Sequence, residues 1–230
     1  MKPRDLRSAR LRKNWSQVDA AARLGVSQPY LAMMERGQRP LTPKLALRAA
    51  HVYDVAPTAV LRSPRGFPAR VDAATLASNF AGLEYPGFAY LRSRNSKPKN
   101  PGEVLLAALA QGDLEPRLVE ALPWLVLRYW TLDWAWVVPE AKVRDLQNRL
   151  GFVVSLARSL AERAGKNHQA RALADLEGQL NRSRLAPEDT LCQASLPEPE
   201  RRWLAEHRSE LAKHWNLLTD WTADALRYAA

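Results

Sequence analysis

Short stretches with apolar residues at helical spacing, separated by turn residues, fill the first 61 positions of the chain. Within each stretch the apolar side chains recur three or four positions apart, which places them on one face of an α-helix. The capping and breaking residues between the stretches delimit five helices. These helices are predicted over residues 5–13, 17–24, 28–36, 43–53 and 58–61. Five helices in about 60 residues suffice for a compact domain.

A tight turn joins the second and third of these helices. Ser16 and Ser27 are good N-caps, because a serine hydroxyl accepts a backbone N–H from the first turn of a helix. Gly25 ends the second helix where a left-handed conformation is needed, and Gly37 closes the third. Ala21 is small where the two helices cross, so their backbones can approach closely. The stretch is therefore predicted to be a helix-turn-helix.

From residue 102 onward the pattern is helical throughout, and no strand is predicted. In one long segment Pro139 is expected to open a helix that Gly165 ends. No fixed period links the segments, which favours a small bundle or an irregular helical array. The whole chain is therefore predicted to be all-α. The C-terminal helices are expected near 104–109, 118–126, 139–165, 168–183, 198–213 and 215–228.

Two proline-containing stretches interrupt the helical pattern between the two halves. The first, over residues 62–71, contains two prolines and a glycine, and the second, over residues 92–101, is basic and broken by proline. A short helix is expected between them at 72–80. The predicted division is a helix-turn-helix domain over 1–65, a linker with a short helix and a basic loop over 66–101, and a C-terminal domain over 102–230.

The distribution of charge along the chain indicates what the helix-turn-helix binds. The chain has a formal net charge of +10. Residues 1–65 hold 13 Lys and Arg against 4 Asp and Glu, a net of +9, which leaves a net of +1 for residues 66–230. Positive charge confined to one small domain is what phosphate binding through counterion release requires. Double-stranded DNA is therefore the predicted partner of the helix-turn-helix.

Composition and missing motifs argue against a membrane-spanning, secreted or enzymatic protein. No apolar run approaches the ~18 residues of a membrane-spanning helix, and the charged N-terminus lacks the apolar stretch of a secretory signal. The single cysteine, Cys192, has no partner for an internal disulfide, which fits a reducing cytoplasm. No phosphate-binding glycine loop, nucleophile elbow or paired-carboxylate motif is present. A cytoplasmic protein without cofactor, metal, membrane partner or enzymatic activity is therefore expected.

A set of residues at fixed spacing marks the motif and its surroundings. The set consists of Ser16-Gln17, Ala21, Leu24-Gly25-Val26-Ser27, Glu35-Arg36-Gly37, Leu45, Ala49 and Tyr53-Asp54-Val55. It resembles the Cro/cI, or XRE-type, helix-turn-helix family of bacterial and phage transcription regulators. The resemblance covers residues 5–61 and implies a five-helix, lambda-repressor-like DNA-binding domain. It also implies a pair between Arg10 and Glu35, whereas Pro29 and Met33 depart from the polar residues usual at their positions.

In that family the third helix lies in the major groove with its N-terminal residues on base edges. Gln28 can offer adenine a donor and an acceptor. Gln17 resembles the family's phosphate clamp at a helix N-terminus, where the helix dipole favours an anion. For each basic residue, a solvated surface charge is the competing interpretation. The predicted DNA contacts are Gln17, Ser27, Gln28, Tyr30, Met33, Arg36, Arg39 and Lys44, and the residues predicted to hold the motif together are Arg10, Ala21, Gly25, Glu35 and Gly37.

These features predict a sequence-specific transcription regulator, a repressor, that acts as a homodimer on an inverted-repeat operator. The C-terminal domain would supply dimerisation or bind a protein partner. One alternative is an antitoxin-like protein that neutralises a partner through this domain and autoregulates its operon, with residues 216–222 as the partner surface. Another is an enzyme fused to a DNA-binding domain, which a polar pocket containing His207, His214 or Cys192 would support.

The C-terminal half contains further candidates for chemistry or recognition. His207 and His214 are expected on one helical face, but metal binding needs a third ligand, so a solvated face is the preferred interpretation. Cys192 has no histidine nearby in sequence and is expected to be structural. Core packing is the commonest role for clustered tryptophans, ahead of a protein interface and of a small-molecule pocket. The tryptophans concerned are Trp124, Trp130, Trp134 and Trp136.

Overall fold

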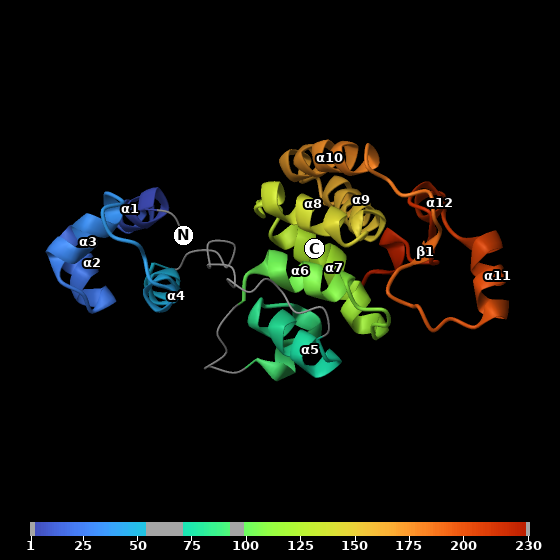
Figure 1. The fold of residues 1–230 in the computed structure, drawn as a ribbon, viewed down its shortest axis with the longest axis horizontal. Coiled ribbons are helices and arrows are strands. Elements are labelled where there is room, and N and C mark those ends of the chain that lie inside the picture. Colours follow the sequence, from blue (N-terminus) through green and yellow to red (C-terminus); the bar gives the residue numbers. More distant parts are fainter. Residues whose placement is uncertain (1–2, 54–70, 93–98, 229–230) are drawn as a thin grey trace. The chain divides into compact units, whose positions relative to one another are not determined.

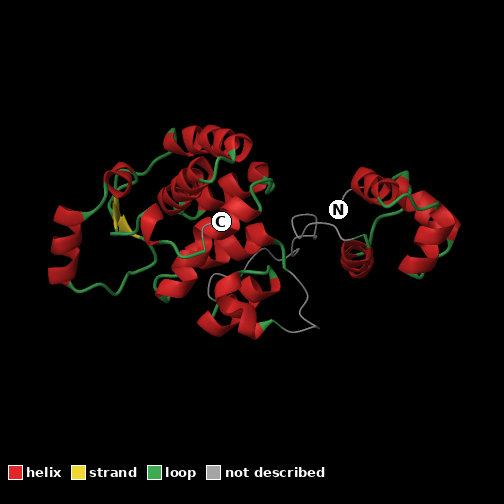
Figure 2. Cartoon of the chain, turned by 180° about the vertical axis from the view of Figure 1, so that it is seen from behind, coloured by secondary structure: helices red, strands yellow, loops and turns green. Residues whose placement is uncertain are grey.

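The computed structural model describes residues 3–53, 71–92 and 99–228. These ranges form helices and one pair of two-residue strands (Figures 1 and 2), so the predicted all-α class is confirmed. None of their helices has the length and apolar character needed to cross a membrane. The chain divides into two compact units. The first comprises residues 1–65 and 98–100, and the second comprises residues 66–97 and 101–230.

The described part of the first unit contains four helices. They are α1 (Pro3–Arg12), α2 (Gln17–Leu24), α3 (Gln28–Glu35) and α4 (Pro43–Val52). The fifth predicted helix, at 58–61, lies outside the described residues. The inner faces of the four helices meet in a small core, which consists of Leu6, Ala9, Ala20, Ala21, Leu24, Leu31, Met34, Ala49 and Tyr53.

The second unit is built around α9 (Gln147–Arg163), whose residues 147–157 are all buried. Packed against α9 are α7 (Pro116–Arg128), α8 (Trp134–Val143) and α10 (Asn167–Asn181). The other elements are α5 (Ala73–Gly82), the 3₁₀ helix η2 (Pro86–Leu91), α6 (Pro101–Leu109), β1 (Asp189–Thr190), α11 (Glu198–His207), α12 (Glu210–His214), β2 (Leu217–Leu218) and the 3₁₀ helix η3 (Ala223–Ala225).

The segment predicted as a linker contributes to the core of the second unit. Leu76 and Phe80 of α5 are buried in the same core as α6 and α7, and so are Tyr85 and Phe88 next to them. Four large apolar side chains need such a surface to cover them, because exposing them to water is costly. The helix expected at 72–80 is present as α5, but it forms part of a folded unit instead of a linker.

The long helix predicted over 139–165 is two helices. Pro139 lies inside α8 and does not open a helix. α8 ends at Val143, and Asp145 in the turn that follows adopts a left-handed conformation with φ of 56°. Leu146 in this turn is 6% exposed. The apolar spacing therefore continues through the break, because Leu146 reaches the core from a turn instead of from a helix.

The last two predicted helices are also incorrect in part. α11 ends at His207, and the Ser209 hydroxyl caps a separate short helix, α12. Residues 215–228 contain no α-helix, because Leu217–Leu218 forms β2 and pairs in parallel with β1. Asn216 turns the chain into this strand with φ of 52°. The expectation of no strand was wrong here, since a short apolar run does not distinguish a helix from a buried strand.

Candidate nucleic-acid interface

Local hydrogen bonds fix the starts of α2 and α3 and the turn between them. The Ser16 hydroxyl accepts the N–H of Asp19 at 3.1 Å, and the Asp19 carboxylate accepts the N–H of Ser16 at 3.2 Å. This reciprocal pair is a capping box. Gly25 ends α2 with φ of 63°, and the Ser27 hydroxyl caps α3 by accepting the N–H of Tyr30 at 3.4 Å. The turn residues predicted from the sequence therefore set the direction in which α3 leaves α2.

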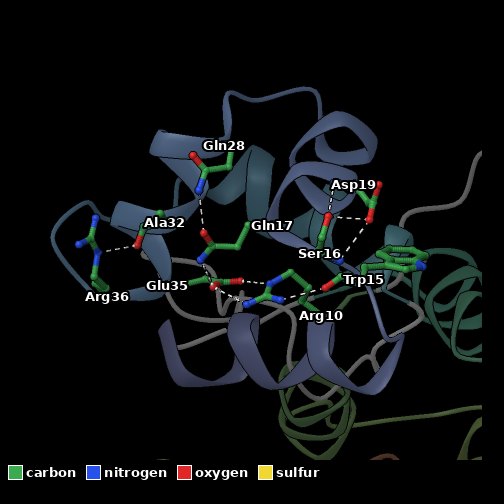
Figure 3. Close-up of polar contacts among 9 residues, drawn as sticks. All are labelled: Arg10, Trp15, Ser16, Gln17, Asp19, Gln28, Ala32, Glu35 and Arg36. Atoms are coloured by element: carbon green, nitrogen blue, oxygen red, sulfur yellow. Dashed lines mark hydrogen bonds and ion pairs between the residues drawn. The ribbon is translucent and has the colours of Figure 1, made fainter.

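A chain of hydrogen bonds links the starts of α2 and α3 to a buried ion pair (Figure 3). Gln28 Nε2 donates to Gln17 Oε1 at 2.8 Å, and Gln17 Nε2 donates to Glu35 Oε2 at 3.0 Å. Glu35 accepts two more bonds from Arg10, at 2.8 Å from Nε and 3.0 Å from Nη2. Arg10 Nη1 also donates to the carbonyl of Trp15 at 2.9 Å. The pair of Arg10 with Glu35 that the resemblance implies is therefore present.

The ion pair is nearly excluded from water. The side chain of Glu35 is 2% exposed and that of Arg10 is 10% exposed. Burial by itself would raise the pKa of Glu35, but hydrogen bonds from Arg10 and Gln17 and the charge of Arg10 outweigh burial and lower that pKa. The hydrogen bond with Glu35 raises the pKa of Arg10. Both groups therefore remain charged at neutral pH.

The charge of Glu35 sets the direction of the whole hydrogen-bond chain. A carboxylate only accepts hydrogen bonds, so Gln17 presents its NH₂ group to Glu35 and its carbonyl to Gln28. Gln28 must then use one of its own N–H groups. Its carbonyl oxygen points away from Gln17 at the N-terminus of α3 (Figure 3), and its second N–H takes no part in the bond to Gln17. The Gln28 amide is thus held in one orientation before any ligand binds.

The other predicted DNA contacts lie on the same unit without joining this chain of hydrogen bonds. Arg36 lies along α3, where its Nε donates to the carbonyl of Ala32 at 3.2 Å. Gln17, Gln28, Tyr30 and Met33 are half-buried, and Ser27, Arg36, Arg39 and Lys44 are exposed. The structure therefore brings Gln17 and Gln28 together, and it leaves the basic residues at the surface.

The remaining residues predicted to hold the motif have structural positions. Ala21 is 2% exposed in the core, and Gly37 has a left-handed φ of 76° at the end of α3. One aromatic contact on the unit is not predicted from the sequence. The Arg23 guanidinium carbon lies 4.3 Å from the centroid of the Trp15 ring, and this centroid lies 5.7 Å from that of the Tyr53 ring. No local pattern signals this contact, because it joins residues from three separate segments.

The predicted tryptophan cluster packs in and against the core of the second unit. Trp124 is 8% exposed, and its ring centroid lies 5.1 Å from that of Tyr85. Trp134 and Trp136 are partly buried and pack against the same core. Trp134 Nε1 also donates to the carbonyl of Trp130 at 2.9 Å, which satisfies its polar group. The tryptophans therefore make the contacts of core residues. One edge of α8 lies at the surface.

The other C-terminal candidates do not form one site. His207 ends α11 and His214 ends α12, so the single helical face predicted for them is wrong, because the chain turns between the two helices. Cys192 is fully buried, and burial raises its pKa to about 11. In the described ranges no three His, Cys, Asp or Glu residues gather as metal ligands. Within 216–222, Leu217–Leu218 is buried and is not available as a partner surface.

Comparison with known proteins identifies the first unit. Residues 6–60 match the family model described as Helix-turn-helix, and the described part of this match contains α2 and α3 with the caps and hydrogen bonds given above. No curated protein and no solved structure matches the chain. The XRE-type resemblance predicted for the N-terminal domain is therefore confirmed.

Proposed function

We propose that this chain, a DNA-binding transcription regulator of the XRE type by its N-terminal domain, is a cytoplasmic repressor that acts as two copies on an inverted-repeat operator. In the proposed complex α3 lies in the major groove, and its first residues contact base edges. The net charge of +9 on residues 1–65 supplies the attraction to phosphate.

The observation that carries the proposal is the fixed orientation of the Gln28 amide at the start of α3. Its carbonyl oxygen can accept from N6 of adenine while its second N–H donates to N7, which is the pairing expected for glutamine in the major groove. Gln17 orients this amide through the 2.8 Å bond to Gln28 and places its own backbone N–H at the positive end of α2, where a phosphate is favoured. The proposed phosphate and sugar contacts are Ser27, Arg36, Arg39 and Lys44, and the proposed thymine-methyl contacts are Tyr30 and Met33.

Two copies are proposed because one helix-turn-helix contacts only a few base pairs. Two copies on half-sites one helical turn apart, about 34 Å, double the contacts and give the operator its two-fold symmetry. Light scattering of the protein with a duplex enriched from a random-sequence pool tests this proposal. A two-to-one complex is expected, and a single copy bound to a site without symmetry would remove the dimer from the proposal.

The first prediction concerns base reading by Gln28. Gln28→Ala is expected to weaken binding to the enriched duplex by about 1–3 kcal/mol, roughly 5- to 150-fold, and to weaken binding to a scrambled duplex much less. Gln38→Ala is the matched control, because Gln38 is an exposed glutamine just beyond α3. Titration of labelled duplexes measures both affinities. An equal loss on both duplexes would show that Gln28 does not read a base.

The second prediction concerns the exposed basic residues after α3. Arg39→Ala and Lys44→Ala are each expected to weaken binding to all duplexes by the same factor and to reduce the slope of log affinity against log salt by about 1. Arg171→Ala, an exposed position on α10, should leave the slope unchanged. Affinities measured over a salt series test this. A slope that stays the same in both variants would contradict the proposed phosphate contacts.

A further inference from the structure

The second unit carries an exposed surface on which apolar side chains adjoin two arginines. Tyr90 and Leu91 end η2, Arg92 follows them directly, and Arg128 ends α7. Tyr90 is 71% exposed, and its ring centroid lies 6.4 Å from that of the buried Phe88, so the core supports the ring from one side. Leu91 and both arginines are also exposed. Tyr90, Leu91, Arg92 and Arg128 are called the η2 surface below.

The carboxylate of Glu84 lies between the two arginines of the η2 surface. Glu84 Oε1 is 3.8 Å from Arg92 Nη2, and Glu84 Oε2 is 3.7 Å from Arg128 Nη2. Both distances exceed the roughly 2.7–2.9 Å of a charge-assisted hydrogen bond. Glu84 therefore draws the two guanidinium groups towards each other without binding their N–H groups closely. It does so from a left-handed conformation with φ of 72°, which favours glycine over glutamate.

The core of the unit fixes the position of Arg128 beside Glu84. α5 and α7 lie next to each other (Figure 1). Tyr129, which follows α7 and is 5% exposed, donates its hydroxyl hydrogen to the carbonyl of Leu83 at 2.8 Å. This bond joins the end of α7 to the end of α5, directly before Glu84. The two arginines therefore approach each other because the fold holds their elements together.

Positive charge in the second half of the chain is concentrated next to this surface. Residues 92–99, which begin with Arg92, hold four Lys and Arg and no Asp or Glu. Residues 101–230 hold 16 Lys and Arg against 18 Asp and Glu. The excess positive charge of residues 66–230 therefore belongs to the segment that starts at the η2 surface. A polyanion is the partner that such a concentration of charge attracts.

We infer that the η2 surface binds the phosphate backbone of the duplex DNA that flanks the site held by the first unit. Arg92 and Arg128 donate to phosphate oxygens, which replace Glu84 as their anionic partner. The Tyr90 hydroxyl donates to a further phosphate, and Leu91 lies against a deoxyribose. These contacts involve no base edge, so they are the same for every flanking sequence.

Duplex DNA is favoured over other polyanions because of the first unit. When the first unit binds DNA, it raises the effective concentration of the same duplex around the second unit. A contact that is weak by itself then adds to the affinity of the whole chain. In this respect the inference rests on the proposed function, and it names a second surface for the same partner.

The length of the flanking DNA is the variable that tests the inference. The full-length chain is titrated over a salt series with the enriched duplex, either trimmed to its half-sites or extended on both sides by random sequence. The extended duplex should bind more tightly, with a slope of log affinity against log salt that is steeper by about 2 for each bound copy. Arg92→Ala and Arg128→Ala should each remove about 1 from this slope on the extended duplex and change nothing on the trimmed one.

A variant of Glu84 should have the opposite effect. Glu84→Gln removes the anion that competes with phosphate for both guanidinium groups, so the affinity for the extended duplex should rise at least about twofold. A surface with only a structural role would not gain affinity when it loses its ion pairs. Arg202→Ala on α11 is the matched control for the arginine variants, because Arg202 is an exposed arginine paired with Glu198 at 3.2 Å. It should change the affinity for neither duplex.

The outcomes separate this inference from the proposed function. If the unaltered chain binds no duplex, the proposed function fails. If the chain binds both duplexes with the same affinity and salt slope, or if Arg92→Ala and Arg128→Ala leave the difference between them unchanged, the η2 surface does not contact flanking DNA and the proposed function stands. A loss of affinity in these variants for a single-stranded oligonucleotide alone would also overturn the inference, because exposed aromatic rings such as that of Tyr90 stack on unpaired bases.

Discussion

Arg10→Met is expected to destabilise the DNA-binding unit strongly and with it to weaken DNA binding. The substitution leaves the carboxylate of Glu35 buried with a hydrogen bond from Gln17 but without its ion-pair partner. Removing one member of a buried ion pair costs about 3–5 kcal/mol. A domain of some 65 residues has only about 3–10 kcal/mol of stability in total. The loss therefore consumes from about a third to all of the stability of this unit.

The hydrogen-exchange rates of peptides from residues 3–53 in the full-length chain measure this effect without interference from the second unit. Arg10→Met/Glu35→Met is the matched control, because a buried pair replaced by two apolar residues often keeps its stability. We expect the double variant to exchange more slowly than the single one. If the single variant keeps its protection to within about 1 kcal/mol, the ion pair does not stabilise the unit as argued.

The same pair makes the stability of the unit depend on pH in a defined direction. The pKa of Glu35 is lowered in the folded state from 4.5, so its ionisation stabilises the fold. This contribution is fully present above about pH 4.5 and is lost as the pH falls through the lower folded-state pKa. The pKa of Asp19 is also lowered, by its hydrogen bonds with Ser16, and changes stability in the same direction. Asp19→Asn separates the two contributions, and Glu35→Gln should remove the part due to Glu35.

The parts of the helix-turn-helix that could be predicted are those encoded by neighbouring residues. Ser16, Gly25 and Ser27 fix helix ends through contacts with residues at most four positions away, so the sequence predicts them directly. The hydrogen bond of Gln28 to Gln17 spans 11 positions, and that of Gln17 to Glu35 spans 18. Such contacts depend on how the helices cross, which the residue pattern does not specify. The positions of the predicted site residues were therefore accessible, but the orientation of the Gln28 amide was not.

In the second unit, the residue pattern predicted the local structure incorrectly at two places. Helical spacing predicted a long helix over α8 and α9, because Leu146 and its neighbours keep the apolar period through a turn. It also predicted a helix where Leu217–Leu218 forms β2, because two adjacent apolar residues fit both structures. In both places the tertiary contact decides the local structure. Leu146 and Leu217 both belong to the core of the second unit, where packing outweighs local preference.

One consequence of that packing is the second large prediction. Gly151→Ala in α9 is expected to destabilise the second unit, although alanine in a helix interior is normally favoured over glycine by about 1 kcal/mol. A Cβ atom at this position would lie 2.3 Å from Cζ3 and 2.4 Å from Cη2 of Trp215. Trp215 is fully buried, and its Nε1 donates to the Ser155 hydroxyl at 2.9 Å, which in turn donates to Glu177 at 2.6 Å. The hydrogen bond at Nε1 therefore fixes one end of the ring while the Cζ3–Cη2 edge lies against Gly151.

We therefore expect Gly151→Ala to reduce the free energy of unfolding of the second unit by about 2–3 kcal/mol, the upper range for an overpacked core. Urea denaturation followed by tryptophan fluorescence reports on this unit, since every tryptophan except Trp15 belongs to it. Gly178→Ala on α10 is the matched control and should stabilise by about 0.5–1 kcal/mol, because nothing lies within 4 Å of its added Cβ. In a Trp215→Leu background the space is empty, so Gly151→Ala should cost little or nothing there. A loss of the same size in both backgrounds would show that contact with Trp215 is not the reason for glycine at this position.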